Sequence, residues 1–178
     1  PGGAFQTRPG VFAWDRVDAA SRMLAQVLPD DLHGRVADFG AGWGYLSLQV
    51  LARCPKVASL DLYEADARSL ALADENLADA HLPVHCHWHD VARGVDERFD
   101  AIVCNPPFHA LGRGDRPDIG RAFIAAAASA LKPGGRTRRT HPVSLDFLPD
   151  QRDILGQRTG IGCSQQGIFL GQHALEFG

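Results

Sequence analysis

Residues 35–45 read Arg35-Val36-Ala37-Asp38-Phe39-Gly40-Ala41-Gly42-Trp43-Gly44-Tyr45, and this stretch decides the fold. Its first five residues are mostly apolar, which is typical of a short buried strand. Three closely spaced glycines then predict a tight turn, and Leu46, Val50 and Leu51 follow at helical spacing. A strand, a glycine turn and a helix in succession indicate the crossover unit from which parallel sheets are built.

The same alternation continues along the chain in both directions. Downstream we expect strands over 57–64, 83–88 and 99–104 and helices over 65–80 and 119–131. Upstream, apolar residues at helical spacing predict a helix with Asp15 as its N-cap and Pro29 as its stop. Strands that alternate with helices predict an α/β protein with a mostly parallel, twisted sheet and helices on both faces.

The fourth expected strand runs directly into Asn105-Pro106-Pro107-Phe108-His109. Two consecutive prolines stop a strand because each lacks an N–H and has a fixed φ. Asn105 is therefore expected at the carboxyl end of a buried strand, which is the edge where open α/β sheets bind ligands. An ordinary strand-terminating turn explains Asn-Pro-Pro equally well when the motif is taken alone.

Acidic residues stand at the ends of the other three strands. Asp38 precedes the glycine turn, where a carboxylate would attract a ligand's ammonium group and repel a pyrophosphate. Glu64 follows Gly40 by 24 residues, at a place suited to both hydroxyls of a ribose, and Asp90 is placed to accept from an adenine amino group. Each acid alone is more typical of a solvated strand end, but together they describe one cleft.

Composition narrows the class of protein. The chain has 178 residues, 45% hydrophobic and 22% charged, a length and balance typical of one globular domain. No apolar run approaches the roughly 20 residues of a membrane helix, so we expect a cytoplasmic protein that does not act on membranes. The net charge of −3 gives no overall basic surface for nucleic acid. The four cysteines form no CxxC motif, which favours free thiols over a metal site or disulfide.

The ordered motifs around 38–44, Glu64, Asp90 and 105–108 resemble those of class I S-adenosylmethionine-dependent methyltransferases that modify a nitrogen atom. Within that superfamily, 9–12, 15–18 and 105–109 resemble the catalytic domain of bacterial ribosomal-RNA guanine-N2 methyltransferases of the small-subunit type. The resemblance covers about 7–135. It implies a Rossmann-like methyltransferase fold, S-adenosyl-L-methionine as cofactor, and methylation of a guanine amino group during rRNA processing.

The resemblance also implies a role for each motif. The catalytic residues would be Asn105, Pro106, Pro107 and Phe108, with Phe108 stacked on the base. Cofactor binding would involve Asn105 together with Pro9, Gly10, Val11, Phe12, Asp38, Gly40, Ala41, Gly42, Glu64, Ala65, Asp90 and Val91. Methyl transfer of this kind needs no metal. Ribosomal RNA or a ribosomal subunit is the implied partner, and many relatives carry a second, degenerate methyltransferase-like domain in front of the catalytic one. Since Met23 is the only methionine, we expect the chain to be a fragment of a longer protein from which such a domain is missing.

The chain departs from the family pattern after Gly135. The next buried strand is due at 136–142, but the guanidinium groups of three arginines there cannot lie unpaired inside a covered sheet. Residues 157–167 show neither a helical nor a strand period. We therefore expect two parts, a methyltransferase core over 1–135 and an atypical C-terminal tail over 136–178 in which the usual strands are altered or missing.

Several alternatives stay open at this point. His85, His87 and His89 alternate, as zinc ligands or a solvent-facing strand would, and we favour the strand. Two interpretations are open for the arginines near the loop after the Asn-Pro-Pro motif, Arg113, Arg116 and Arg121. They contact the phosphates of a nucleic acid, or they face solvent. The rival functions are another N-methyltransferase (adenine-N6 or protein glutamine-N5), a nicotinamide-dependent oxidoreductase using the same glycine turn, and a non-catalytic module that binds RNA or protein.

Overall fold

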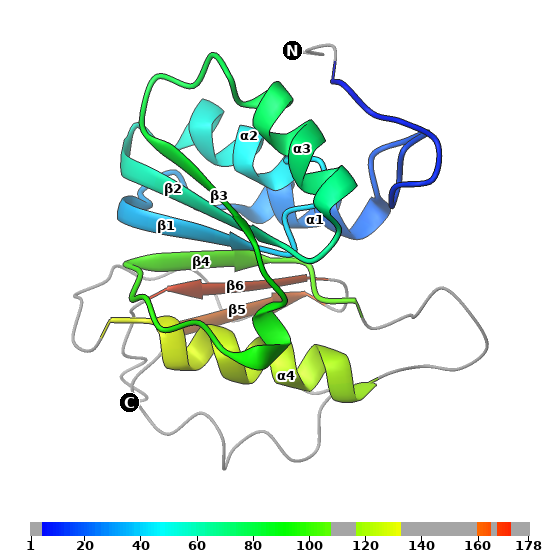
Figure 1. The fold of residues 1–178 in the computed structure, drawn as a ribbon. Helices are drawn as coiled ribbons and strands as arrows, with labels where there is room; N and C mark the ends of the chain where they lie inside the picture. Colours follow the sequence, from blue (N-terminus) through cyan, green and yellow to red (C-terminus); the bar gives the residue numbers. More distant parts are fainter. Residues whose placement is uncertain (1–4, 108–116, 133–159, 165–166, 172–178) are drawn as a thin grey trace.

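The computed structural model describes residues 5–107, 117–132, 160–164 and 167–171 of the chain (Figure 1). A single six-stranded sheet forms its centre, in the order β3-β2-β1-β4-β6-β5. The strands are β1 (His33–Phe39), β2 (Lys56–Glu64), β3 (Val84–Trp88), β4 (Ala101–Cys104), β5 (Gly160–Ser164) and β6 (Gly167–Gly171). The first four strands are parallel to one another.

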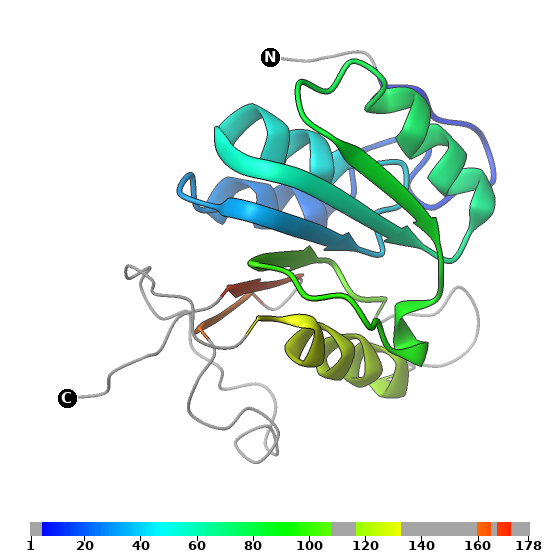
Figure 2. The ribbon, with the colours of Figure 1, turned by 60° about the vertical axis from the view of Figure 1, so that its left-hand side comes forward.

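Helices cover both faces of this sheet, as expected from the sequence. The helices α1 (Ala19–Val27), α2 (Tyr45–Arg53) and α3 (Ala67–Asn76) lie on one face, and α4 (Pro117–Ala130) lies on the other (Figures 1 and 2). A single 3-10 turn, η1 (Val91–Arg93), packs against α4. In the described part of the chain, no helix is both long and apolar enough to cross a bilayer.

The order of the strands reverses at β1. The chain proceeds from β1 to β2 and β3 on one side and then returns to place β4 on the other side of β1. Phe39, the last residue of β1, pairs with Tyr63 of β2 and with Cys104 of β4. The residues that follow these three therefore leave the sheet at the same edge, at the switch point where α/β proteins bind ligands.

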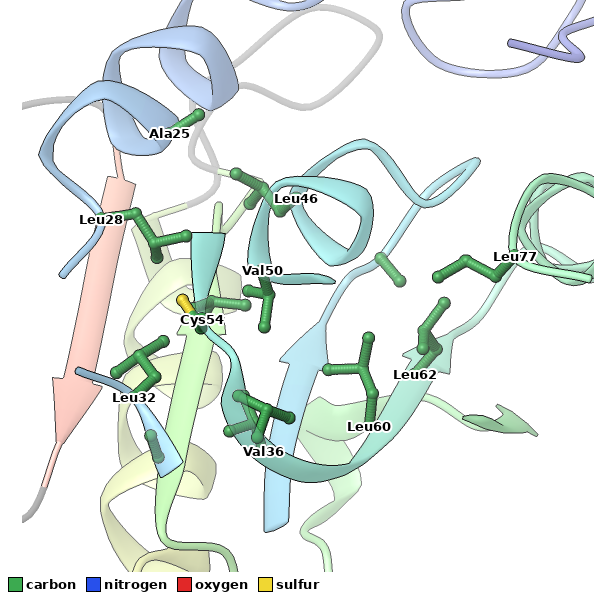
Figure 3. Close-up of a cluster of buried hydrophobic side chains, with 14 of the residues drawn as sticks. Ala25, Leu28, Leu32, Val36, Leu46, Val50, Cys54, Leu60, Leu62 and Leu77 are labelled. Atoms are coloured by element: carbon green, nitrogen blue, oxygen red, sulfur yellow. The ribbon is translucent and has the colours of Figure 1, made fainter. Parts of the chain in front are cut away.

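Alternation along β1 supplies one side chain to each of two cores. Val36 packs with Val50 and Leu60 beneath the three helices of one face (Figure 3). Phe39 packs on the α4 face, where its ring meets Phe99 edge-on at 6.1 Å. All these side chains are buried, and because each face of the sheet has its own apolar cluster, the central strands are nearly continuous apolar runs.

Helix boundaries differ from those expected from the sequence. The predicted N-cap of the first helix was wrong: α1 begins at Ala19, and Asp18 rather than Asp15 accepts a hydrogen bond from the Ser21 backbone N–H at 2.9 Å. The helix α3 is also shorter than predicted, because Asp66 caps its start by accepting from the Arg68 N–H and 77–80 continue as turns.

The C-terminal segment contains the strands Gly160–Ser164 and Gly167–Gly171, although the sequence of 157–167 shows no strand period. β6 pairs antiparallel with β4, and β5 pairs antiparallel with β6. Gly160 and Gly162 contribute no side chain to a pattern, so β5 forms through backbone pairing with β6, which in turn covers the otherwise open edge of β4. The basic residues of 136–142 lie outside the described residues, and the boundary expected near 135 stays a prediction.

A polar network on the α4 face joins the first three strands. Arg35 donates to both carboxylate oxygens of Asp61, at 2.8 and 2.7 Å, and His87 Nε2 lies 2.9 Å from Asp61 Oδ1. Burial acts to raise the pKa of Asp61, but the hydrogen bonds from Arg35 and His87 outweigh it and lower the pKa. The Arg35 guanidinium also lies 4.8 Å from the centre of the Phe99 ring.

Replacement of Asp61 by alanine is expected to destabilise the fold. The free energy of unfolding should fall by about 2–3 kcal/mol, below the usual cost of breaking a fully buried ion pair because the Arg35 side chain is 36% exposed. Because the folded-state pKa of Asp61 is lowered, its contribution is present at neutral pH and is lost in acid. Urea unfolding at pH 7 and pH 4 measures both effects. The same substitution at exposed Asp31 serves as control, and equal losses for both variants would contradict the network's role.

Candidate active site at the carboxyl edge of the sheet

The glycine turn after β1 is held by the end of β2. The backbone N–H groups of Gly40 and Ala41 donate to the Tyr63 carbonyl at 2.8 and 3.2 Å. The Gly42 N–H donates to Glu64 Oε2 at 2.8 Å, and the other oxygen of this carboxylate accepts from the Asp66 N–H. The structure thus brings together the glycine turn and the acid expected to hold a ribose.

Two glycines of this turn are required for different reasons. Gly44 has φ +91° and forms the N-cap of α2, and a Cβ there would lie 2.8 Å from Leu77 Cδ1. Gly42 has φ +56°, but a Cβ at this position would meet nothing within 4 Å. Gly44 therefore allows close packing, whereas the space beside Gly42 is open to a ligand approaching the backbone.

Asp38 is a buried carboxyl group next to the turn. Its Oδ2 accepts from the Ser47 hydroxyl at 2.7 Å, while its Oδ1 has no hydrogen-bond partner among the described residues. Burial raises the pKa of Asp38 to about 7, although the Ser47 hydrogen bonds oppose this and the charge of Glu64 adds to it. A buried acceptor without a partner indicates a place for a donor from a ligand.

Asn105 lies at the end of β4, beside the turn that follows β1. Its Nδ2 group donates to Asp18 Oδ2 at 3.0 Å and to Ser21 Oγ at 2.9 Å, both in the first turn of α1. Its Oδ1 makes no hydrogen bond within the described residues. The following Pro106 is buried and Pro107 is exposed, while Phe108 and His109 lie outside the described residues. The motif thus leaves an amide oxygen available at the carboxyl edge.

The segment before α1 folds back onto the glycine turn. Val11 is buried against Trp43 and Leu72. Asn76, at the end of α3, exchanges two hydrogen bonds with the Gln6 backbone and donates to the Trp43 carbonyl at 2.8 Å. Of the residues 9–12 expected near this turn, Val11 packs against it. Pro9, Gly10 and Phe12 are exposed, and 56% of the Phe12 surface is accessible.

The end of β3 carries the last group of predicted site residues. Asp90 accepts from the Ala92 N–H at 3.0 Å and so caps η1, and Val91 is buried in the core of the α4 face. Ala65, just beyond Glu64, is exposed, and its carbonyl accepts from the Trp88 indole at 2.9 Å. These residues lie at the ends of β2 and β3, on the same edge as the glycine turn.

Comparison with known proteins decides the family. The family model of the methyltransferase small domain matches residues 2–149. The chain belongs to the methyltransferase small domain family. This assignment confirms the resemblance inferred from the motifs.

Curated relatives of the chain include methyltransferases of small-subunit and of large-subunit ribosomal RNA. The chain is 34% identical to ribosomal RNA small subunit methyltransferase C of Psychromonas ingrahamii over 72% of its length, covering 36% of that protein. It is 35% identical to ribosomal RNA large subunit methyltransferase G of Alcanivorax borkumensis, again over 72% of its length and 34% of that protein. The chain thus spans about a third of the length of these relatives.

The solved structure of a ribosomal RNA methyltransferase confirms the Rossmann-like methyltransferase fold of this chain. The 16S rRNA N2 methyltransferase of T. thermophilus, solved in complex with AdoMet and guanosine, superposes with a TM-score of 0.65 at 28% identity. The alignment covers 95% of this chain and 47% of that protein. The small domain described above therefore has the fold of that methyltransferase.

Sequence reasoning missed three polar residues of this methyltransferase domain. Ser21, Ser47 and Asn76 contact Asn105, Asp38 and the Trp43 carbonyl respectively. All three lie on helices, where a lone polar residue gives no signal of its partner. Only Ser21 carried a local indication, since it stands three residues after an acid, at the spacing of an N-cap contact.

The histidines of the third strand have separate partners. His87 contacts Asp61 and stacks on the Tyr63 ring at 4.4 Å, and His89 Nε2 lies 2.7 Å from the Gly94 carbonyl. His85 is exposed. Across the described residues, no group of three His, Cys, Asp or Glu side chains is arranged to hold a metal ion. Of the arginines considered for phosphate contacts, Arg121 is exposed on α4 and the other two lie outside the described residues.

The buried carboxyl group of Asp38 is expected to give the fold a distinctive pH dependence. Its pKa is about 7 in the folded chain and 3.8 in its ordinary state, so between these values the folded form binds more protons than the unfolded form. The contribution of Asp38 to stability therefore decreases as the pH rises from about 4 to about 7. Asp38→Asn lacks this titration and should gain a few kcal/mol relative to the wild type over the same range. Thermal unfolding from pH 4 to 8 measures the difference, with Asp31→Asn as control, and parallel wild-type and Asp38→Asn profiles would contradict it.

Proposed function

We propose that the chain is the catalytic part of an S-adenosyl-L-methionine-dependent methyltransferase that methylates the N2 amino group of a guanine in ribosomal RNA. The observation that carries this proposal is the available Oδ1 of Asn105, held next to the glycine turn at the carboxyl edge. The curated names of two relatives support ribosomal RNA as substrate, and the guanosine complex of the T. thermophilus protein supports guanine.

The residues around the turn fit the proposed cofactor. Asp38 Oδ1 lacks a partner and would accept from the ammonium group of the methionine part. The open space beside Gly42 would admit this part against the backbone. Each Glu64 oxygen accepts one N–H and keeps a lone pair for a ribose hydroxyl. Asp90 and Val91 would frame the adenine at the end of β3. When bound, the cofactor supplies an electrophilic methyl group.

The protein's part in the reaction is to orient the amino group. The nitrogen of an exocyclic amine is a poor nucleophile, because its lone pair is delocalised into the base. Asn105 Oδ1 and the Pro106 carbonyl would each accept a hydrogen bond from one of the two N–H groups of this amine. These hydrogen bonds favour a pyramidal nitrogen with a directed lone pair. Phe108 would stack on the base, worth about 1–3 kcal/mol, and a paired guanine would first be flipped out. Positioning then supplies most of the rate enhancement.

The rival functions are less well supported by the same contacts. Asp38 offers an acceptor oxygen without a partner next to the glycine turn, which suits an ammonium group better than the pyrophosphate of a nicotinamide cofactor, and such an enzyme leaves the Asn105 motif without a role. Adenine-N6 and glutamine-N5 methyltransferases would use the same amide oxygen, so the product must separate them. The proposed substrate implies a cytoplasmic enzyme that binds a ribosomal subunit, with a further methyltransferase-like domain of the longer parent protein contributing to RNA recognition.

Cofactor choice is testable by calorimetry. S-adenosylhomocysteine should bind with one site per chain, and Glu64→Gln should weaken it about 10-fold, the value of roughly one charged hydrogen bond. Asp31→Asn is the control, because Asp31 is exposed and precedes β1, at the opposite end of that strand from the turn. Binding of NADH without binding of S-adenosylhomocysteine would favour the oxidoreductase instead.

The reaction itself is testable with ribosomal subunits and a labelled methyl donor. The wild type should yield N2-methylguanosine, identified by mass spectrometry of the digested RNA. Asn105→Ala should lower kcat about 100-fold or more, the scale found when one oriented group of a preorganised site is removed. The circular dichroism of this variant should match that of the wild type, which separates loss of activity from loss of the fold. If the product were N6-methyladenosine, or if the variant kept full activity, the guanine assignment or the role of Asn105 would be wrong.

A further inference from the structure

Asn105 is held by residues more than 80 positions away in the sequence. Its Nδ2 group carries two hydrogens, and the structure gives each an acceptor: Asp18 Oδ2 at 3.0 Å and Ser21 Oγ at 2.9 Å. Both acceptors belong to the start of α1, which packs on the sheet face opposite α4 (Figure 1). The start of a helix that packs on the sheet thus contacts the asparagine of the proposed catalytic motif.

The chemistry of Asp18 decides which way the Asn105 amide faces. The two ends of an amide have nearly the same shape, and its terminal torsion is broad and roughly two-fold. An ionised carboxylate only accepts hydrogen bonds, so it attracts the NH₂ end and repels the oxygen. With Asp18 at 3.0 Å, the NH₂ end must face α1 and Oδ1 must face away from it.

From these contacts we propose that Asp18 and Ser21 are positioning residues that lock the Asn105 amide with Oδ1 directed at the incoming amino group. This inference rests on the proposed function, because an amino substrate requires an acceptor there. Without the two contacts the amide would rotate. Its NH₂ end would then face the substrate's NH₂ group, and two donors would meet. The expected consequence is loss of kcat with unchanged cofactor affinity.

Asp18 also has a structural role, which the test must separate from positioning. The same Oδ2 caps α1 by accepting from the Ser21 N–H at 2.9 Å. Serine is about as good an N-cap as aspartate, but its short, neutral side chain cannot act as a carboxylate toward Asn105. Asp18→Ser therefore keeps the cap and removes the charge, and Ser21→Ala keeps the cap and removes the second acceptor.

The first experiment compares these variants in the methyl transfer assay. Asp18→Ser and Ser21→Ala should each lower kcat at least 10-fold, with melting temperature and S-adenosylhomocysteine affinity unchanged within error. Ser21→Thr restores the hydroxyl and should recover most of the activity. Asp15→Ser is the matched control, since within the described residues Asp15 pairs with the exposed Arg16. In an Asn105→Ala background, Asp18→Ser should cause no further loss, because the group that it positions is gone. Unchanged kcat in Asp18→Ser, or full additivity with Asn105→Ala, would overturn the proposal.

A second experiment tests the orientation without any activity. Asn76 and Asn105 are the two asparagines of the sequence, so ¹⁵N-asparagine labelling gives two side-chain NH₂ signals. The Asn105 pair should be protected from hydrogen exchange in the wild type and should lose protection in Asp18→Ser and Ser21→Ala. The Asn76 pair, bound to Gln6 and Trp43 carbonyls, should stay protected and serves as reference. Absence of methyl transfer by the wild type would reject the proposed function, whereas an unprotected Asn105 pair would reject the positioning contact.

Discussion

Strand β1 is hydrogen-bonded along both edges, and the rest of the structure depends on this double pairing. Phe39 lies level with Tyr63 on one side and with Cys104 on the other. The chain must therefore leave β1, β2 and β4 at one edge, and the strand register alone brings Glu64 and Asn105 to either side of the glycine turn. Burial of an apolar cluster on each face fixes this register, since a slip of one residue would exchange the two faces.

Two carboxyl groups buried in the same sheet show how stability and function are separated. Burial acts to raise the pKa of both Asp61 and Asp38. Asp61 recovers this cost through Arg35 and His87, which use both of its oxygens, and its pKa falls. Among the described residues Asp38 is bonded to Ser47 alone, so one oxygen is left without a donor and the pKa of Asp38 stays high. Asp61 lies in the middle of β2 and links neighbouring strands. Asp38 lies just before the glycine turn, where a ligand would supply the missing hydrogen-bond donor.

The strands and the residues at their ends could be predicted from the sequence, because the apolar runs mark the core and parallel strands end at a common edge. Glu64 and Asn105 were located in this way, from position alone. The helical residues Ser47 and Asn76 were not, because their partners depend on which turn of a helix faces which strand end, and no local pattern contains that information. The strand Gly160–Ser164 was missed for a different reason: its glycines carry no side chains, and its structure comes from backbone pairing with a neighbour.

The misplaced N-cap shows why orientation is harder to predict than position. Asp15 and Asp18 are equally good caps by composition, and both precede the same apolar period. What distinguishes Asp18 is its second contact, with Asn105, which directly follows β4 and is distant in the sequence. Strand pairing places the Asn105 amide at the carboxyl edge, but it does not determine which end of the amide faces the site. That choice requires a charged acceptor from outside the sheet, and α1 supplies it. Selection on this contact would act on the start of α1 and on the Asn105 motif together. The N-cap pattern and the Asn-Pro-Pro pattern therefore have to be interpreted as a pair.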